Sequence, residues 1–490
     1  MKKGILGILV IMESFFLLLS MLVAILADES SWLCFLLTAL GTSAVGSLCI
    51  YASRKAEGRR MRRADNFLVV ALSWIVFSVV GMVPFLWLTD MDLSSAFFET
   101  MSGFTTTGAT CINEIDSLPR SLLFWRAITQ WIGGLGIVVF SFALIPVYEM
   151  KNSNIYSAEV TGLGLDKLRP KIGATARRVL LIYLVLTGSC ALLYWLGPMS
   201  LYDAVCHAFT TIATGGFSTH SASIAYFHSS YIEYVASLFM IVSSINFSLY
   251  YYMSIRRSHV LFRNEEVRVF LGYIGVAVAC FMLLFYFAPV PDDALSTLPK
   301  GFEETFRSAL FHVSSVATST GFSAQKFDYV AWGASFWMPT VVIMAIGACA
   351  GSTAGGIKVI RVIICAKSVF NELILMLHPR AVIGVRVGKQ IVPQEKVRQA
   401  LSFIFIYILL VVIAMTCYSL LGADVDTALG SSISMLSNVG PATGATGPAN
   451  TFAGVPASGK WLMSAYMLIG RLEIFTVLFL LMPNYWKDRK

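Results

Sequence analysis

The chain has 490 residues, of which 57% are hydrophobic and only 13% are charged, whereas about a quarter of the residues in a soluble globular protein are charged. This composition excludes a soluble globular protein, and several apolar stretches reach about 20 residues, the length that crosses the hydrocarbon core of a bilayer. The net charge of +8 lies beside these stretches, so it indicates membrane topology and not binding to nucleic acid.

Basic loops set the direction of the first helices. Residues 4–27 and 32–53 are predicted to form two helices, and six Lys and Arg residues follow at 54–63. The positive-inside rule places this loop in the cytoplasm, so a third helix at about 66–89 runs outward. A fourth helix at about 121–148 returns to a second basic loop, which we also place in the cytoplasm.

Six further helices continue this alternation, and we expect both termini on the cytoplasmic side of the membrane. The second basic loop covers 151–178, and residues 365–396 have the pattern of an amphipathic cytoplasmic segment. The prediction is an all-α membrane protein with two N-terminal helices and four repeats around one pore. The later helices are expected at 179–197, 231–254, 268–288, 333–363, 398–421 and 459–482. The expected divisions are 1–63 for the first two helices, then 64–178, 179–267, 268–396 and 397–490 for the repeats.

Each repeat contains an apolar segment too short to span the membrane, followed by a glycine in a loop rich in Ser and Thr. The short segments cover about 94–105, 202–213, 303–317 and 426–437. The glycines are Gly108, Gly216, Gly321 and Gly440. An ungapped alignment on these glycines places Glu99 opposite His207, and His207 opposite His312. We interpret the two histidines as packing positions shared by the repeats, with a pair of metal ligands as the alternative.

Irregular backbone at membrane depth is stable only where it is buried in protein or lines a water-filled cavity. We therefore interpret each short segment and its loop as a re-entrant half-helix that faces its three counterparts around one axis. Potassium channels use this plan, with backbone carbonyl oxygens that replace the hydration shell of the ion. A glycine suits such a loop because the required backbone conformation is one that a side chain resists.

The loops FTTTGAT, TGGFST, TSTGFS and SNVGPATG, preceded by two extra helices, resemble those of the Trk-type potassium uptake transporters, relatives of the Ktr and HKT transporters. GACAGSTAGGIKVIR at 347–361 resembles the intramembrane gating loop of that family. GRLEIFT at 470–476 resembles the segment that carries its pore arginine. The resemblance covers nearly the whole chain. It implies a potassium transporter and not an enzyme, with no cofactor and with K⁺ as the substrate.

Potassium binding is assigned to the backbone carbonyls of three residues in each loop. Only one glycine per loop matches the G-Y-G of potassium channels, and by resemblance to the Trk-type family this implies looser selectivity for potassium over sodium. In the second loop either Gly215 or Gly216 could be the filter glycine, and the alignment favours Gly216. The residues at the second glycine position are Thr110, Ser218, Ser323 and Ala442. The assigned residues are Thr106, Thr107, Gly108, Thr214, Gly215, Gly216, Ser319, Thr320, Gly321, Asn438, Val439 and Gly440.

A block of glycines interrupts the predicted eighth helix, and we interpret it as a break that closes the path below the filter. Each glycine disfavours a helix by about 1 kcal/mol relative to alanine. The alternative is a packing face of small residues, because three of the glycines recur every four residues. The residues assigned to gating are Gly347, Gly351, Gly355, Gly356, Lys358 and Arg471.

Arg471 lies within the predicted tenth helix, where a charge is costly unless it faces a cavity or the interior of the helix bundle. One alternative is a structural pair with Glu473, but residues two apart do not share a helix face. We expect Arg471 to hydrogen-bond the gating loop and to repel cations in the closed state.

The family resemblance also implies partners. It predicts a homodimer in membrane lipid above a cytosolic ring of nucleotide-binding regulatory subunits, since the chain itself has no nucleotide-binding motif. The alternative function within transport is a less selective channel or a cation symporter that admits potassium, sodium and ammonium.

Overall fold

The computed structural model describes residues 2–54, 63–144, 172–254, 260–292, 294–295, 298–323 and 329–483. Most of the two predicted basic loops at 54–63 and 151–178 lies outside these residues, as does the basic C-terminal end. The regular secondary structure of the described chain is helical except for one small antiparallel hairpin, in which β1 (Arg386–Val387) pairs with β2 (Gln390–Ile391).

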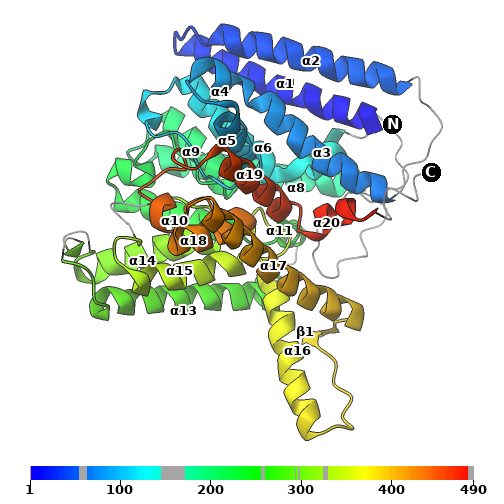
Figure 1. The fold of residues 1–490 in the computed structure, drawn as a ribbon, viewed down its shortest axis with the longest axis vertical. Helices are drawn as coiled ribbons and strands as arrows, with labels where there is room; N and C mark the ends of the chain where they lie inside the picture. Colours follow the sequence, from blue (N-terminus) through cyan, green and yellow to red (C-terminus); the bar gives the residue numbers. More distant parts are fainter. Residues whose placement is uncertain are drawn as a thin grey trace.

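The two N-terminal helices, α1 (Lys2–Leu26) and α2 (Trp32–Arg54), lie together along one edge of the molecule (Figure 1). A Cβ on Gly7 would lie 2.5 Å from the carbonyl oxygen of Gly46, and a Cβ on Gly46 would lie 2.7 Å from that of Gly7. The two backbones touch at this crossing because neither residue has a side chain.

Four repeats follow, each with a membrane helix, a half-helix of 12–17 residues and a second, often interrupted, membrane helix. Repeat 1 contains α3 (Arg63–Gly81), α4 (Val83–Leu88), α5 (Leu93–Phe104) and α6 (Arg120–Leu144). Repeat 2 contains α8 (Ile172–Trp195), α9 (Leu201–Ile212), α10 (Ser230–Ser243) and α11 (Phe247–Ser254). Repeat 3 contains α13 (Glu265–Phe287), α14 (Gly301–Ala317), α15 (Ala334–Ile346) and α16 (Val359–Leu377), and α12 (Val260–Arg263) precedes it. Repeat 4 contains α17 (Gln394–Leu420), α18 (Val425–Ser437), α19 (Ala457–Arg471) and α20 (Phe475–Leu481).

The second helices of the repeats are broken more often than the sequence predicts. The expected single helices at 231–254 and 459–482 are wrong: α10 and α11 meet at 88°, and α19 and α20 meet at 115°. Among the described residues, six helices are long and apolar enough to cross a membrane, and eight if each bent pair is one span. The other two expected spans correspond to α6, which is kinked at Gly136, and to α15 with α16.

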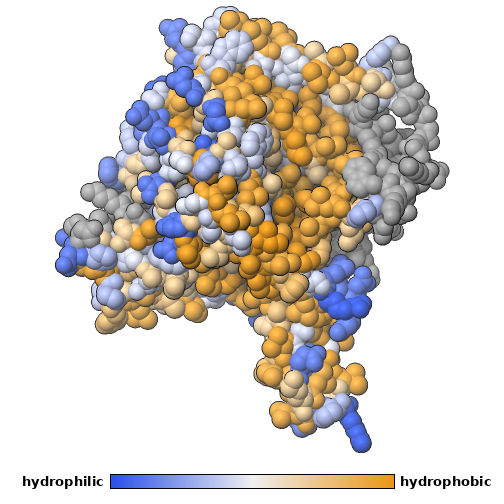
Figure 2. All heavy atoms as spheres, in the orientation of Figure 1, coloured by the Kyte–Doolittle hydropathy of each residue, from blue (hydrophilic) through white to orange (hydrophobic). Residues whose placement is uncertain are grey.

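The half-helices are buried although they are rich in polar residues. Eleven of the 12 residues of α5 are buried, and they include Glu99, Thr100 and Ser102. The outer helices instead expose large apolar side chains, such as Phe15 and Phe405. Figure 2 shows apolar residues over a broad part of the surface, with polar residues gathered toward the edges of this view. This inverted distribution is expected where lipid is the solvent around a polar centre.

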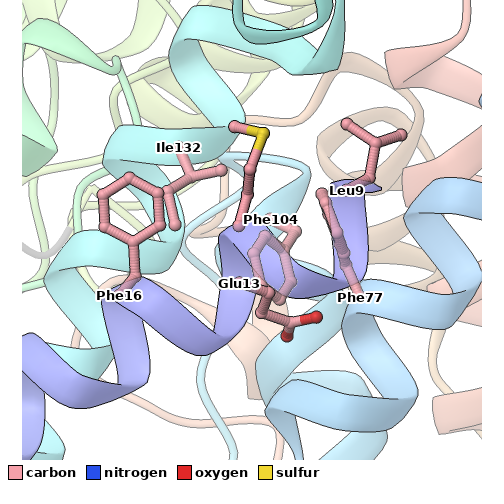
Figure 3. A pocket seen from close by; sticks show the side chains of 7 residues that line it. Leu9, Glu13, Phe16, Phe77, Phe104 and Ile132 are labelled. Atoms are coloured by element: carbon pink, nitrogen blue, oxygen red, sulfur yellow. The ribbon is translucent and has the colours of Figure 1, made fainter. Parts of the chain in front are cut away.

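A small apolar pocket behind the first half-helix contains an unpaired acid, Glu13 of α1 (Figure 3). Glu13 is 2% exposed, and neither of its carboxyl oxygens has a hydrogen-bond partner among the described residues. Burial of a polar group without a partner costs about 1–3 kcal/mol in proteins. The side chain therefore opposes stability at a position where an apolar residue of similar length would fit. The pocket is lined by Leu9, Met12, Glu13, Phe16, Phe77, Phe104 and Ile132.

Replacing this acid should stabilise the protein. We expect Glu13→Met to raise the melting temperature of the purified protein by roughly 1–5 °C, because it removes an unpaired polar group and keeps the volume. Thermal unfolding in detergent measures the change, and Glu13→Gln should gain less because its amide is also unpaired. A lower melting temperature for Glu13→Met would show that the carboxyl group is needed.

Candidate cation filter and gate

The four half-helices end in the same backbone motif. In each, a residue at the helix end has a left-handed conformation with φ of 53° or 54°: Thr106, Thr214 and Ser319 directly follow the helix cap, and Asn438 is itself the cap. The next residue donates its N–H to the carbonyl five residues earlier, as Thr107 does to Ser102 at 2.9 Å and Val439 does to Ser434 at 3.0 Å. This Schellman-type end satisfies helix carbonyls, and it strains non-glycine residues by roughly 1–2 kcal/mol each. The repeats are therefore equivalent at the level of backbone geometry.

The four loop glycines close a ring. Each has a positive φ: 81° at Gly108, 79° at Gly216, 81° at Gly321 and 102° at Gly440. A Cβ on each glycine would also collide with a carbonyl oxygen of a neighbouring loop, always that of the residue before the neighbour's glycine. These distances are 2.0 Å from Gly108 to Gly215, 1.9 Å from Gly216 to Thr320, 2.1 Å from Gly321 to Val439 and 2.5 Å from Gly440 to Thr107.

We call the carbonyls of Thr107, Gly215, Thr320 and Val439 the carbonyl ring. Each loop contacts the next one in chain order, and the fourth contacts the first, so the backbones encircle one axis. Only glycine allows both the positive φ and this approach. In the second loop it is Gly216, and not Gly215, that has the conformation shared by the other three loops.

A polar residue lies nine positions before Gly108, Gly216 and Gly321, and in the first two repeats it bonds the loop. The Glu99 carboxylate accepts from the Cys111 N–H (2.9 Å) and forms a buried ion pair with Arg126 (2.9 Å). His207 hydrogen-bonds Ser218 (2.9 Å), and His312 hydrogen-bonds Thr340 (2.9 Å). The two histidines therefore have separate hydroxyl partners. Among the described residues, no group of three or more His, Cys, Asp or Glu side chains is placed to hold a metal ion.

Residues 347–358, between α15 and α16, form an irregular loop directly against the ends of the half-helices. The Thr353 hydroxyl lies 3.1 Å from that of Thr214, and the Gly355 N–H donates to the Ser319 hydroxyl (2.8 Å). A Cβ on Gly355 would lie 2.0 Å from the Ser437 carbonyl oxygen. The loop thus contacts the second, third and fourth repeats at the ends of their half-helices.

The alternative of a helical packing face for these glycines is wrong. Gly347, Gly351 and Gly356 have φ of 71°, 73° and 80°, which no α-helix contains. Lys358 has φ of 68°, and its buried ammonium group donates to the Ala354 carbonyl within the same loop. The loop is held from outside by Glu266 of α13, whose carboxylate accepts from the Ala350 N–H (2.7 Å).

Arg471 connects loop 347–358 to the first repeat. Its guanidinium donates to the Thr353 carbonyl (2.6 Å), which is the hydrogen bond to the loop that the sequence predicts, and also to the Gly133 carbonyl of α6. Glu473 forms an ion pair with Arg361 of α16. α19 ends at Arg471, so this charge lies at a helix break beneath the glycine loops and not within a continuous helix.

Comparison with known proteins agrees with this geometry. A family model named TrkH and described as a cation transport protein matches residues 33–487. The chain belongs to the TrkH family.

Relatives and solved structures of the TrkH family match over the full length. The "Trk system potassium uptake protein TrkH" of Salmonella typhimurium is 36% identical over 99% of this chain and 98% of its own. The TrkG protein of Escherichia coli is 34% identical over 98% of this chain and 97% of its own. The crystal structure of the potassium transporter TrkH from Vibrio parahaemolyticus has a TM-score of 0.85, with 33% identity and 99% of both chains covered.

Residues on α6 complete the site in this TrkH-family chain, and the sequence analysis missed them. Gln130 donates to the Gly215 carbonyl (2.7 Å) and accepts from the Phe217 N–H (3.0 Å). Arg126 donates to the Ser218 carbonyl (3.1 Å). A Cβ on Gly133 would lie 1.9 Å from the Phe104 carbonyl oxygen, so α6 touches the end of the first half-helix. The sequence signal that could have identified them is the presence of polar and small residues within the apolar span of α6.

A histidine lies between two carboxylates from different repeats. His220 hydrogen-bonds Asp116 (2.9 Å), lies 3.5 Å from Asp203 and stacks on Tyr226. Burial alone would lower the pKa of His220, but hydrogen bonds and charge attraction to Asp203 and Asp116 raise it above its usual value. Protonated His220 therefore stabilises the contact between the loops of the first two repeats.

The stabilisation by His220 should depend on pH. A raised pKa means that the contribution is fully present below about pH 6.5, the ordinary value, and is lost as pH rises through the folded-state pKa. We expect wild-type protein to lose its advantage in melting temperature over His220→Gln as pH increases from about 6 to 9. The exposed His378 provides a control, because His378→Gln should leave the profile unchanged. A constant difference between wild type and His220→Gln would contradict the assignment.

Proposed function

We propose that this chain conducts potassium into the cell as the membrane subunit of a Trk-type uptake system. The closed carbonyl ring carries the proposal, because four loops of one chain surround one axis with backbone oxygens, the ligands that replace the hydration shell of K⁺. The printed names of the relatives support potassium as the cargo. The membrane potential would drive uptake, at about 2.3 kcal/mol per charge per 100 mV.

The proposed ion ligands are the twelve loop residues predicted from sequence, acting through their backbone carbonyls. Their positions at the ends of buried half-helices support this role, since the helix C-terminus carries a partial negative charge. They are Thr106, Thr107, Gly108, Thr214, Gly215, Gly216, Ser319, Thr320, Gly321, Asn438, Val439 and Gly440. Because each chain supplies all four loops, each subunit would contain its own pore.

The second candidate function is transport with looser selectivity among monovalent cations, and the outer ends of the loops favour it. Thr110 uses its hydroxyl to bond Glu99, and Ser218 uses its hydroxyl to bond His207, behind the loops. These residues stand where potassium channels have a second glycine, so the outer carbonyls lack the matching conformation. A monovalent cation channel or symporter that also admits sodium or ammonium would have such a filter.

We further propose that loop 347–358 and Arg471 form the gate. The loop lies against the inner ends of the half-helices, and Arg471 joins it to α6 across the axis. The irregular path needs the positive φ of Gly347, Gly351 and Gly356 and the close approach of Gly355 to the Ser437 carbonyl. Lys358 ends the loop and bonds the Ala354 carbonyl within it. A fixed positive charge at this depth would repel cations until the loop moves.

Removing the arginine should open the path. We expect Arg471→Ala to raise potassium flux into proteoliposomes by about tenfold, since it removes the charge, one hydrogen bond to the loop and one to α6. Flux of potassium, rubidium, sodium and ammonium is compared in the same vesicles. Arg268→Ala, at an exposed position of α13, is the matched control and should behave as wild type. Unchanged or lower flux in well-folded Arg471→Ala protein would contradict the proposed gate.

The cytoplasmic side offers surfaces for the two proposed partners, which are a second copy of this chain and a ring of nucleotide-binding subunits. α16 projects beyond the other helices (Figure 1) and exposes apolar side chains, among them Phe370, Met376 and Leu377.

The position of the basic loops in the sequence supports an orientation with both termini in the cytoplasm of a bacterium and the protein in its inner membrane. We also propose repeat divisions at 64–178, 179–267, 268–396 and 397–490. The order and bounds of the helices support these divisions.

A further inference from the structure

The amide of Gln130 is bonded to one member of the carbonyl ring. We propose that Gln130 is a positioning residue that sets the cation preference of the filter by bracing the Gly215 carbonyl; this inference rests on the proposed function. Gln130 lies on α6 of the first repeat, whereas Gly215 belongs to the loop of the second. It thus acts across a repeat boundary and through the backbone, without touching the ion.

Gln130 spans both sides of the second loop's filter glycine. Its Nε2 donates to the Gly215 carbonyl at 2.7 Å, and its Oε1 accepts from the Phe217 N–H at 3.0 Å. The two bonds determine the orientation of the amide, because the first partner only accepts and the second only donates. The side chain is fully buried, so water does not compete for either bond. Residues 215–217 are therefore held to a membrane helix at two points.

The other three members of the carbonyl ring have no such donor. Within the described part of the chain, the carbonyls of Thr107, Thr320 and Val439 accept no side-chain hydrogen bond. Hydroxyls of the third and fourth half-helices bond carbonyls further along their own loops, from Ser315 to Phe322 (2.7 Å) and from Ser434 to Gly440 (3.0 Å). One ligand in four is thus fixed in position and shares its electron density with an amide.

The same contact explains why the second loop has two glycines. Gly215 has no positive φ, but a Cβ at this position would lie 2.4 Å from the amide oxygen of Gln130 and 2.8 Å from its nitrogen. The equivalent residues Thr107, Thr320 and Val439 carry side chains. Gly216 serves the ring closure, and Gly215 makes room for Gln130. The two residues Gln130 and Gly215 therefore form one unit.

The two hydrogen bonds of Gln130 have a direct consequence for ion selectivity. A ring of mobile carbonyls can contract around a smaller ion, whereas a carbonyl tied to α6 cannot follow. Arg126 lies one helical turn from Gln130 and also holds the second loop, with its guanidinium carbon 4.1 Å from the centre of the Phe217 ring. Loss of the Gln130 bonds should let the second loop move inward and admit sodium more readily.

The first experiment compares wild type with Gln130→Met, which keeps the length of the side chain and removes both bonds. We measure how strongly K⁺, Rb⁺ and Na⁺ each raise the melting temperature of the purified full-length protein, and the flux ratios in proteoliposomes. The preference for K⁺ over Na⁺ should fall by about tenfold, the effect of losing one or two hydrogen bonds. Gln399→Met, at an exposed position of α17, is the control and should keep the wild-type ratio.

The second experiment tests whether Gln130 and Gly215 act as one unit. It asks whether their substitutions have non-additive effects on the preference for K⁺ over Na⁺. Gly215→Ala should displace the flexible end of Gln130 and cause the same loss of preference, and the double variant Gly215→Ala/Gln130→Met should be no worse than either single variant. Gly216→Ala is the contrast: its Cβ meets the backbone carbonyl of Thr320, so its defect should add to that of Gln130→Met.

The outcomes separate the two proposals. Cation-dependent stabilisation or flux with an unchanged K⁺/Na⁺ ratio in Gln130→Met would overturn the role of Gln130 and leave the proposed function intact. Additive effects of Gly215→Ala and Gln130→Met would also overturn it. Wild-type protein that shows neither stabilisation nor flux with any cation would instead refute the proposed function. Should Gln130→Met fail to fold, Gly215→Ala alone provides the same comparison of K⁺ with Na⁺.

Discussion

The structure depends on one constraint: irregular backbone lies at membrane depth, where every unpaired polar group is costly. The chain meets this constraint by turning four loops toward one another and packing glycines against neighbouring carbonyls. Left-handed residues at the helix ends satisfy the last carbonyls of each half-helix, at the cost of backbone strain in Thr106, Thr214 and Ser319. Lipid-facing helices then need only be apolar, which explains why the polar residues are concentrated at the centre.

The same constraint explains the role of the broken second helices. The break between α10 and α11 exposes backbone that loop 347–358 bonds, from the Cys349 N–H to the Ser244 carbonyl and from the Phe247 N–H to the Gly351 carbonyl. The break after α19 leaves Arg471 at a helix end, where its guanidinium reaches two carbonyls on different repeats. Interrupted helices and the loop therefore satisfy one another, and none of them would be stable alone at this depth.

Much of this architecture was predictable from sequence because repetition and hydropathy are strong signals. The four glycines, the short segments before them and the loop at 347–358 were found in this way, and Gly216 has the conformation that the alignment favoured. The bends at 244–246 and 472–474 were missed because Ile245 and Ile474 look like any apolar helix residue; their conformation is imposed by contacts with distant segments. Gln130 was missed for a similar reason, since its partners lie 85 and 87 residues away.

The cyclic contact between loops of one chain has a consequence for how such a filter can change. In an assembly of four identical subunits, every substitution alters all four walls at once. Here each loop is encoded separately, so a mutation changes one loop directly and can reach another only through the contact between neighbours. Asn438 in one loop and Thr106, Thr214 and Ser319 in the others are products of that independence. Under the proposed function, ion preference can therefore change without an equal change in all four loops, which a symmetric channel does not allow.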